Sequence, residues 1–70
     1  MNLADAKIDR ATRERAYGLA ESGNFDTARD VERALINEGW PNAACVLRNG
    51  YTMQLVDEKC RAARRLIHSA

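Results

Sequence analysis

The 70-residue sequence is poor in the residue types that small proteins use to reinforce a fold. Its two cysteines, Cys45 and Cys60, are too few for a disulfide scaffold, and their separation matches no common metal-ligand or redox spacing. We therefore expect free thiols. Net charge is also lacking: 11 Lys and Arg against 10 Asp and Glu leave +1, which excludes a strongly basic nucleic-acid tail or an acidic mimic as the organising principle.

Long apolar runs are missing as well. No signal-peptide run follows the start, because Asp5 and Asp9 fall where such a run would lie. No stretch approaches the roughly 18 apolar residues that cross a bilayer. We therefore expect a cytoplasmic protein with no membrane partner.

Side chains that carry catalysis or bind metals are scarce. The single histidine, His68, is typical of a solvated helix end. Asp57 and Glu58 diverge on a helix, because adjacent residues do not face each other. Cys60 falls on an apolar stripe, as small core residues do. No nucleophile, base or metal cluster can be assembled from these residues, so we expect no enzyme, cofactor, metal site or small-molecule substrate.

Helical periodicity, by contrast, runs through most of the chain. A first helix is expected over residues 4–21, ending at Gly23. A second begins at Asp26 or Thr27, since Thr27 and Asp30 have the spacing of a capping box, and ends at Gly39. The predicted buried stripes of these two helices are Ile8, Ala11, Thr12, Ala16, Leu19 and Ala20, and then Ala28, Val31, Ala34 and Leu35.

Pro41 favours the start of a short third helix, closed by Asn49-Gly50, with Cys45 on its exposed side. The last helix is expected from Thr52, as N-cap, to about Ile67. The predicted inward residues are Ala43, Val46 and Leu47 in the third helix, and Met53, Val56, Cys60, Ala63 and Ile67 in the last. Four basic residues suit the negative end of the last helix dipole: Lys59, Arg61, Arg64 and Arg65.

These segments predict an all-α fold, a compact bundle of about four short helices in a single domain over residues 1–70. The alternative is an α+β fold with a β-hairpin at residues 44–56, because Asn49-Gly50 between apolar flanks is also a strong turn signal. In that register Val46 opposes Met53. The flanks alternate poorly in polarity, however, and an isolated hairpin needs another layer to cover it, so helices are favoured.

Three sequence blocks follow one another in a set order: L-A-x-S-G-x-F, V/I-E-x-x-L-x-x-E-G-Y/W-x-x-A-x-x-x-L and L-x-x-x-C-x-x-A-R. In this pattern the chain resembles a set of small uncharacterised proteobacterial proteins, with Val56 in place of the leucine of the last block. The resemblance implies a bacterial protein whose last block is helical, and it carries no known activity. The matching residues are Leu19, Ala20, Ser22, Gly23 and Phe25; Val31, Glu32, Leu35, Glu38, Gly39, Trp40, Ala43 and Leu47; and Val56, Cys60, Ala63 and Arg64.

The last helix has a wider apolar face than one neighbouring helix needs. A chain this short buries only roughly 60% of the surface that its unfolded form exposes, so covering a spare apolar row with another chain would add stability. We expect a non-enzymatic protein-interaction or regulatory domain, whose partner is another protein or a second copy of itself. The candidate interaction surface is Leu55, Lys59, Ala62, Arg65 and Leu66.

A helix-turn-helix-like DNA-binding regulator is the alternative function. The segment Leu19–Gly23, followed by Val31 and Leu35, resembles that motif, with its glycine at the turn, but the gap to Val31 is about two residues too long. The helix that would read DNA also carries more acidic than basic residues, which repels phosphates and favours a protein partner. These residues are Asp26, Asp30, Glu32 and Glu38 against Arg29 and Arg33.

The single tryptophan, Trp40, lies in the tight corner between the second and third helices. The corner resembles the glycine-aromatic loop of ubiquitin-associated domains, although the stretch from Trp40 to Leu47 is too short to match. We expect Trp40 to be structural, its ring filling the space that small alanines leave at the helix junction.

Overall fold

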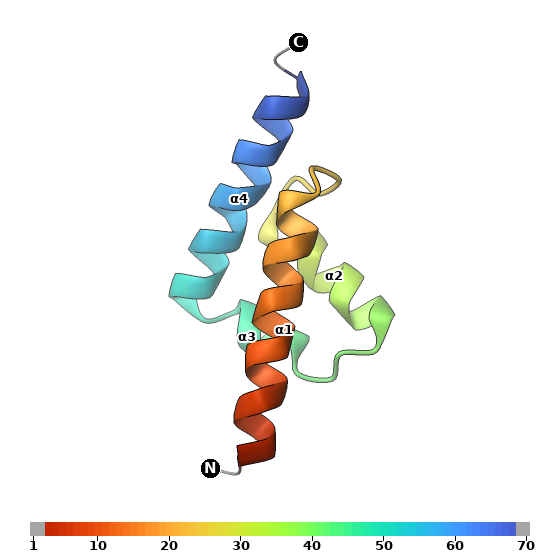
Figure 1. The fold of residues 1–70 in the computed structure, drawn as a ribbon, viewed down its shortest axis with the longest axis vertical. Coiled ribbons are helices and arrows are strands. Elements are labelled where there is room, and N and C mark those ends of the chain that lie inside the picture. The colour runs from red at the N-terminus through yellow and green to blue at the C-terminus, as the bar shows by residue number, and fades with distance from the viewer. Residues whose placement is uncertain (1–2, 69–70) are drawn as a thin grey trace.

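Four helices account for most of the chain in the computed structural model, which describes residues 3–68 and the side chains of residues 7–66 (Figure 1). They are α1 (Leu3–Glu21), α2 (Ala28–Glu38), α3 (Ala43–Leu47) and α4 (Gly50–His68). No strand occurs within residues 3–68. The all-α bundle of about four helices is confirmed, and the β-hairpin at residues 44–56 is wrong.

The turn at Asn49 shows why the helix prevails over the hairpin. The Asn49 Oδ1 atom accepts hydrogen bonds from the backbone N–H groups of Tyr51, at 3.1 Å, and Thr52, at 3.4 Å. Asn49 therefore caps α4, and the expected cap Thr52 is instead a buried residue of its first turn. A two-residue hairpin of the Asn-Gly type needs positive φ at both residues, and neither Asn49 nor Gly50 has it.

The ends of α2 follow the sequence signals closely. The Thr27 hydroxyl accepts the N–H of Asp30 at 3.3 Å, which confirms the predicted cap. At the other end Gly39 has a φ of 94°, a left-handed conformation that glycine adopts without steric cost. The N–H groups of Gly39 and Trp40 then bond the carbonyls of Ile36 and Leu35, so the helix ends in a Schellman motif.

The core lies where α1 packs on the other three helices, most extensively on α4. As predicted, the inward residues of α3 are buried, as are Thr12, Val31 and Leu35. Many of the core side chains are small, which lets short helices approach closely. The buried apolar residues are Ala16, Ala20, Ala28, Val31, Leu35, Ala43, Val46, Leu47, Val56 and Cys60.

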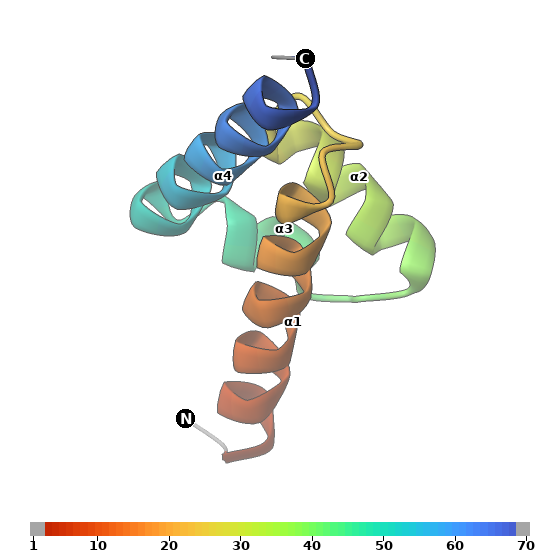
Figure 2. The ribbon, with the colours of Figure 1, turned by 45° about the horizontal axis from the view of Figure 1, so that its top comes forward.

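The molecule is elongated, with extents of 46 × 22 × 15 Å, because its two long helices overhang opposite ends. The first turns of α1 project away from the other helices, and the last turns of α4 continue beyond the turn that follows α1 (Figures 1 and 2). Within residues 3–68 no helix combines the length and the apolar character needed to span a membrane.

Two residues expected in the core are exposed. Ile8 borders an open hollow with Pro41 and Cys45, which leaves its side chain exposed. Met53 borders an open hollow with Thr27 and Asp57, because α2 begins only at Ala28 beside it. Ile67 lies outside the described side chains. The remaining expected core residues are half-buried: Ala11, Leu19, Ala34 and Ala63.

Candidate interaction surface

Two rows of side chains run along α4. We call Val56 and Cys60, both fully buried against the bundle, the inner row. The outer row is Leu55, Lys59, Ala62 and Leu66. Its residues recur at spacings of four, three and four, which places them on one strip of a helix, with Arg65 beside them.

The outer row becomes more exposed toward the end of α4. Leu55 is half-buried, Ala62 is exposed, and the Leu66 side chain is 79% exposed. Arg65 is exposed as well. The five residues predicted from the sequence thus lie on one face of one helix, and Ala62, Arg65 and Leu66 lie on the part that follows the contact of Lys59 with the end of α1.

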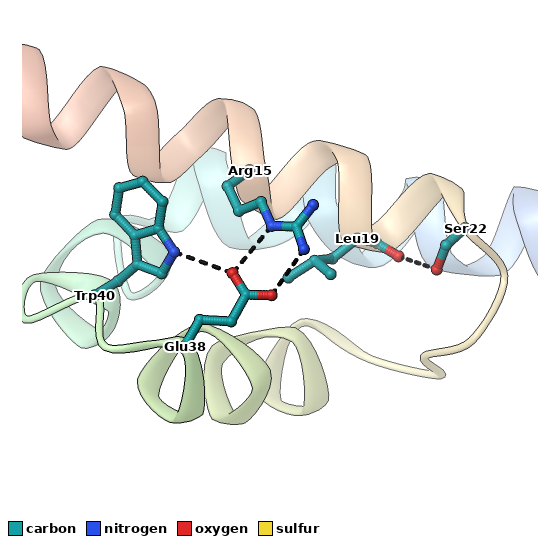
Figure 3. Close-up of polar contacts among 5 residues, drawn as sticks. All are labelled: Arg15, Leu19, Ser22, Glu38 and Trp40. Atoms are coloured by element: carbon teal, nitrogen blue, oxygen red, sulfur yellow. Dashed lines mark hydrogen bonds and ion pairs between the residues drawn. The ribbon is translucent and has the colours of Figure 1, made fainter.

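Beside Leu66 the surface is hollowed into a groove of about 430 Å³ between α4 and the end of α1. The groove is present because α1 ends early: the Ser22 hydroxyl bonds the Leu19 carbonyl at 2.6 Å, and Gly23, with a φ of 81°, turns the chain away (Figure 3). Its lining residues are Glu21, Ser22, Lys59, Ala62, Ala63 and Leu66.

A second hollow, of about 180 Å³, lies on the other side of Ala62. It is lined by Glu58, Arg61, Ala62 and Arg65, all on α4. Ala62, whose side chain is a single methyl group, thus borders both hollows. A helix from another molecule could approach the backbone of α4 closely at this residue.

Lys59 does not obstruct this approach, because its side chain is directed toward α1. Its Nζ atom lies 2.9 Å from Glu21 Oε1 and 5.4 Å from the centre of the Tyr17 ring. The ammonium group is thus held at the edge of the groove. Lys59 thus lies at the edge of the groove, and Ala62 lies between Lys59 and Leu66 in the outer row.

The basic half of α4 does more than complement the helix dipole. Arg64 pairs with Asp26 and donates a hydrogen bond to the Gly23 carbonyl at 3.3 Å, so it fastens α4 to the α1–α2 connection. Lys59 fastens α4 to the end of α1 through its ion pair with Glu21. Arg61 and Arg65 remain exposed to solvent.

Two acidic residues of α4 have roles that were not predicted. Asp57 accepts the N–H of Ala28 at 2.6 Å and thereby satisfies a free donor at the start of α2. No local pattern could reveal a contact between residues so far apart in the sequence. Glu58 is exposed beside the outer row, and the heptad-like spacing of that row could have identified it as a flanking charge.

Trp40 lies at a polar junction between α1 and α2 (Figure 3). The half-buried ring packs against the core, and its Nε1–H donates to Glu38 Oε1 at 3.1 Å. Arg15 bonds both oxygens of the same carboxylate, at 3.0 and 2.8 Å. These hydrogen bonds lower the pKa of Glu38, and the carboxylate raises the pKa of Arg15. The arrangement agrees with the structural role expected for Trp40.

The two thiols are free, and they differ in accessibility. Cys45 is exposed, as predicted from its place on α3. Cys60 is buried, and its pKa is raised, first by desolvation and then by the carboxylates of Asp57, Asp30 and Asp26. Raising the pKa removes thiolate, which makes Cys60 a poor nucleophile. Among the residues that the structure describes, no group of three His, Cys, Asp or Glu is placed to hold a metal ion.

Comparison of the chain with protein-family models, curated proteins and solved structures gives no match. The function is therefore inferred from the outer row of α4 and the two hollows beside it.

Proposed function

We propose that this chain is a non-enzymatic, cytoplasmic bacterial interaction domain that binds another protein through the outer row of α4. The observation that carries the proposal is the exposure of Leu66, at 79%, beside a groove whose floor includes Ala62 and Ala63. Burying a leucine side chain of this kind contributes about 1.5–3 kcal/mol, which a partner helix or loop would gain.

The surroundings of the outer row have the anatomy of a small interface. Apolar side chains lie at its centre, and charged groups that can stay hydrated lie at its edge. Lys59 and Glu21 border one side, and Glu58 and Arg65 border the other. A partner could therefore bury the apolar centre while the charged rim keeps contact with water.

DNA binding in the manner of a helix-turn-helix protein is the second candidate. Its strongest support is the pair Arg29 and Arg33, both exposed on α2. Three further arginines near α2 are instead engaged with acidic side chains, which reduces the positive charge available to phosphates. These pairs are Arg15 with Glu38, Arg48 with Glu32 and Arg64 with Asp26.

A pull-down from an extract of the cells that make the protein distinguishes the two candidate functions. The tagged full chain is compared with Leu66→Glu, with and without nuclease. Ile36→Glu is the matched control, because Ile36 is an exposed apolar residue of α2, far from the outer row in the sequence.

The proposal predicts proteins that the wild type and Ile36→Glu retain and that Leu66→Glu loses, with no effect of nuclease. Each such protein is then purified and its binding to the three chains is measured directly. Material lost on nuclease treatment, or equal retention by all three chains, would contradict the proposal. Circular dichroism verifies that both variants keep their helices.

A further inference from the structure

The proposed interaction through α4 has a specific geometry when the partner is a second copy. Resting on the proposed function, we infer that two chains pair through their outer rows, with the two α4 helices antiparallel about a two-fold axis next to Ala62. Such a contact is isologous, so the same surface serves on both copies and the assembly closes as a dimer.

The charges beside the outer row are placed for this pairing. Glu58 and Arg65 lie on the same flank of α4, on opposite sides of Ala62 along the helix. In an antiparallel pair each flank meets the same flank of the other helix, as g positions do in antiparallel coiled coils. When the two-fold axis passes between Arg61 and Ala62, Glu58 of each copy lies opposite Arg65 of the other. The dimer therefore contains two such ion pairs.

Within one chain these two charges cannot neutralise each other. They are separated by seven residues, which is about 10 Å along a helix at 1.5 Å per residue. Within residues 7–66 the one hydrogen bond that Glu58 accepts is a long contact of 3.5 Å from Gln54, and no ion pair involves Arg65. Opposite charges on one flank are thus available to a second copy.

The apolar contacts fit the same alignment. Leu66 of one copy falls at the level between Leu55 and Lys59 of the other, next to the Lys59 end of the groove of about 430 Å³. Ala62 lies close to the axis in both copies, and its small side chain lets the two backbones approach. The contact of Lys59 with Glu21 keeps its ammonium group out of the centre.

Other alignments and occupants fit less well. A parallel pair would set the flank of Glu58 and Arg65 against the opposite flank of the second helix, where the uncharged Val56 and Ala63 lie, so it would form neither ion pair. An anionic lipid surface would attract Arg61 and Arg65, but it would repel Glu58 at the edge of the same row. The alternating charge of this flank matches a copy of itself.

A charge exchange between copies tests the inference. The weight-average mass of the full chain is measured by sedimentation over a concentration series, for the wild type, Glu58→Arg and Arg65→Glu. Each single variant places like charges at both ion pairs, so we expect its dissociation constant to rise at least about tenfold. An equimolar mixture of the two variants pairs every positive charge with a negative one, and it should associate as tightly as the wild type.

Arg29→Glu is the control, because it makes the same charge change at an exposed residue of α2 and should leave association unchanged. Melting temperatures show that each variant is folded, and Glu58→Gln and Arg65→Gln repeat the single-variant test with smaller expected losses. A wild type that stays monomeric, or a mixture that associates no better than its components, would overturn the inference. If those results came with a pull-down in which Leu66→Glu still loses partners, the second copy would be excluded while the proposed function stood.

Discussion

The inner and outer rows of α4 both contain apolar side chains, but the inner row is buried and the outer row is increasingly exposed toward the end of the helix. Val56 and Cys60 are fully buried, whereas Ala62, two residues after Cys60, and Leu66 are exposed. The difference comes first from the face of the helix, because Ala62 lies about 200° around α4 from Cys60. It also comes from the length of α1, which ends at Glu21, beside Lys59, so that α1 does not cover the last turns of α4. Which side chains of α4 are covered thus depends on the face that they occupy and on where α1 ends.

The largest expected difference in stability between the two rows comes from placing the same charged residue on each. Val56→Asp places a charge among fully buried apolar residues and should cost more than about 4 kcal/mol, a large part of the stability of a domain this small. Leu66→Asp changes an exposed side chain and should alter the free energy of unfolding by less than about 0.5 kcal/mol at low concentration. Urea unfolding followed by circular dichroism measures both, and similar losses would show that the outer row is part of the core.

Trp40→Ala should give the next largest loss, about 3 kcal/mol, because a large ring packed against the core leaves a cavity. Trp40→Phe keeps most of the ring and removes the hydrogen bond to Glu38, so it should cost about 1 kcal/mol. Thermal unfolding compares the two variants. A Trp40→Ala protein with the wild-type melting temperature and lost association would instead assign Trp40 to an interface.

Asp57→Ala should cost about 1 kcal/mol, since it removes the acceptor for the Ala28 N–H at the start of α2. Glu58→Ala, at the neighbouring exposed residue, is the control and should change stability little at concentrations where the chain is monomeric. Amide hydrogen exchange would locate the effect in the first turn of α2. Equal stability of the two variants would mean that α4 does not support α2 through this bond.

The smallest expected effect is a pH dependence from Glu38. Its pKa is lowered in the folded chain by hydrogen bonds from Arg15 and Trp40. The carboxylate therefore contributes stability that is present above its ordinary pKa and is lost as the pH falls through the lowered value. Unfolding curves of the wild type and Glu38→Gln should differ near neutral pH and converge in acid. A difference that persists in acid would contradict the assignment.

Local signals predicted the helix ends well where the chain makes its own caps. The N-cap contact of Thr27 with Asp30 and the left-handed Gly39 each involve residues within one helical turn. Both were predicted correctly from the sequence. Asn49-Gly50 was ambiguous, because the same dipeptide serves a hairpin turn or the start of a helix. The exposure of Ile8 and the contact of Asp57 with Ala28 depend on the packing of distant segments, so no local pattern could reveal them.

The candidate surface was predicted in part. The spacing of Leu55, Ala62 and Leu66 identified a second apolar row, since helical geometry alone places them together. The groove beside Leu66 could not be predicted, because it depends on where α1 ends relative to α4. Glu58 was missed, although the heptad-like spacing of the same row places it on one flank with Arg65.

A disulfide formed across the two-fold axis tests the pairing of outer rows most directly. Ala62→Cys is made in a Cys45→Ser background, which removes the exposed native thiol and leaves Cys60 buried. Gln54→Cys, at an exposed residue of the same helix, is the control. Under mild oxidation we expect Ala62→Cys to form a covalent dimer much faster than Gln54→Cys, and addition of Arg65→Glu to suppress it. Equal rates for the two cysteines, or no effect of Arg65→Glu, would contradict the antiparallel dimer.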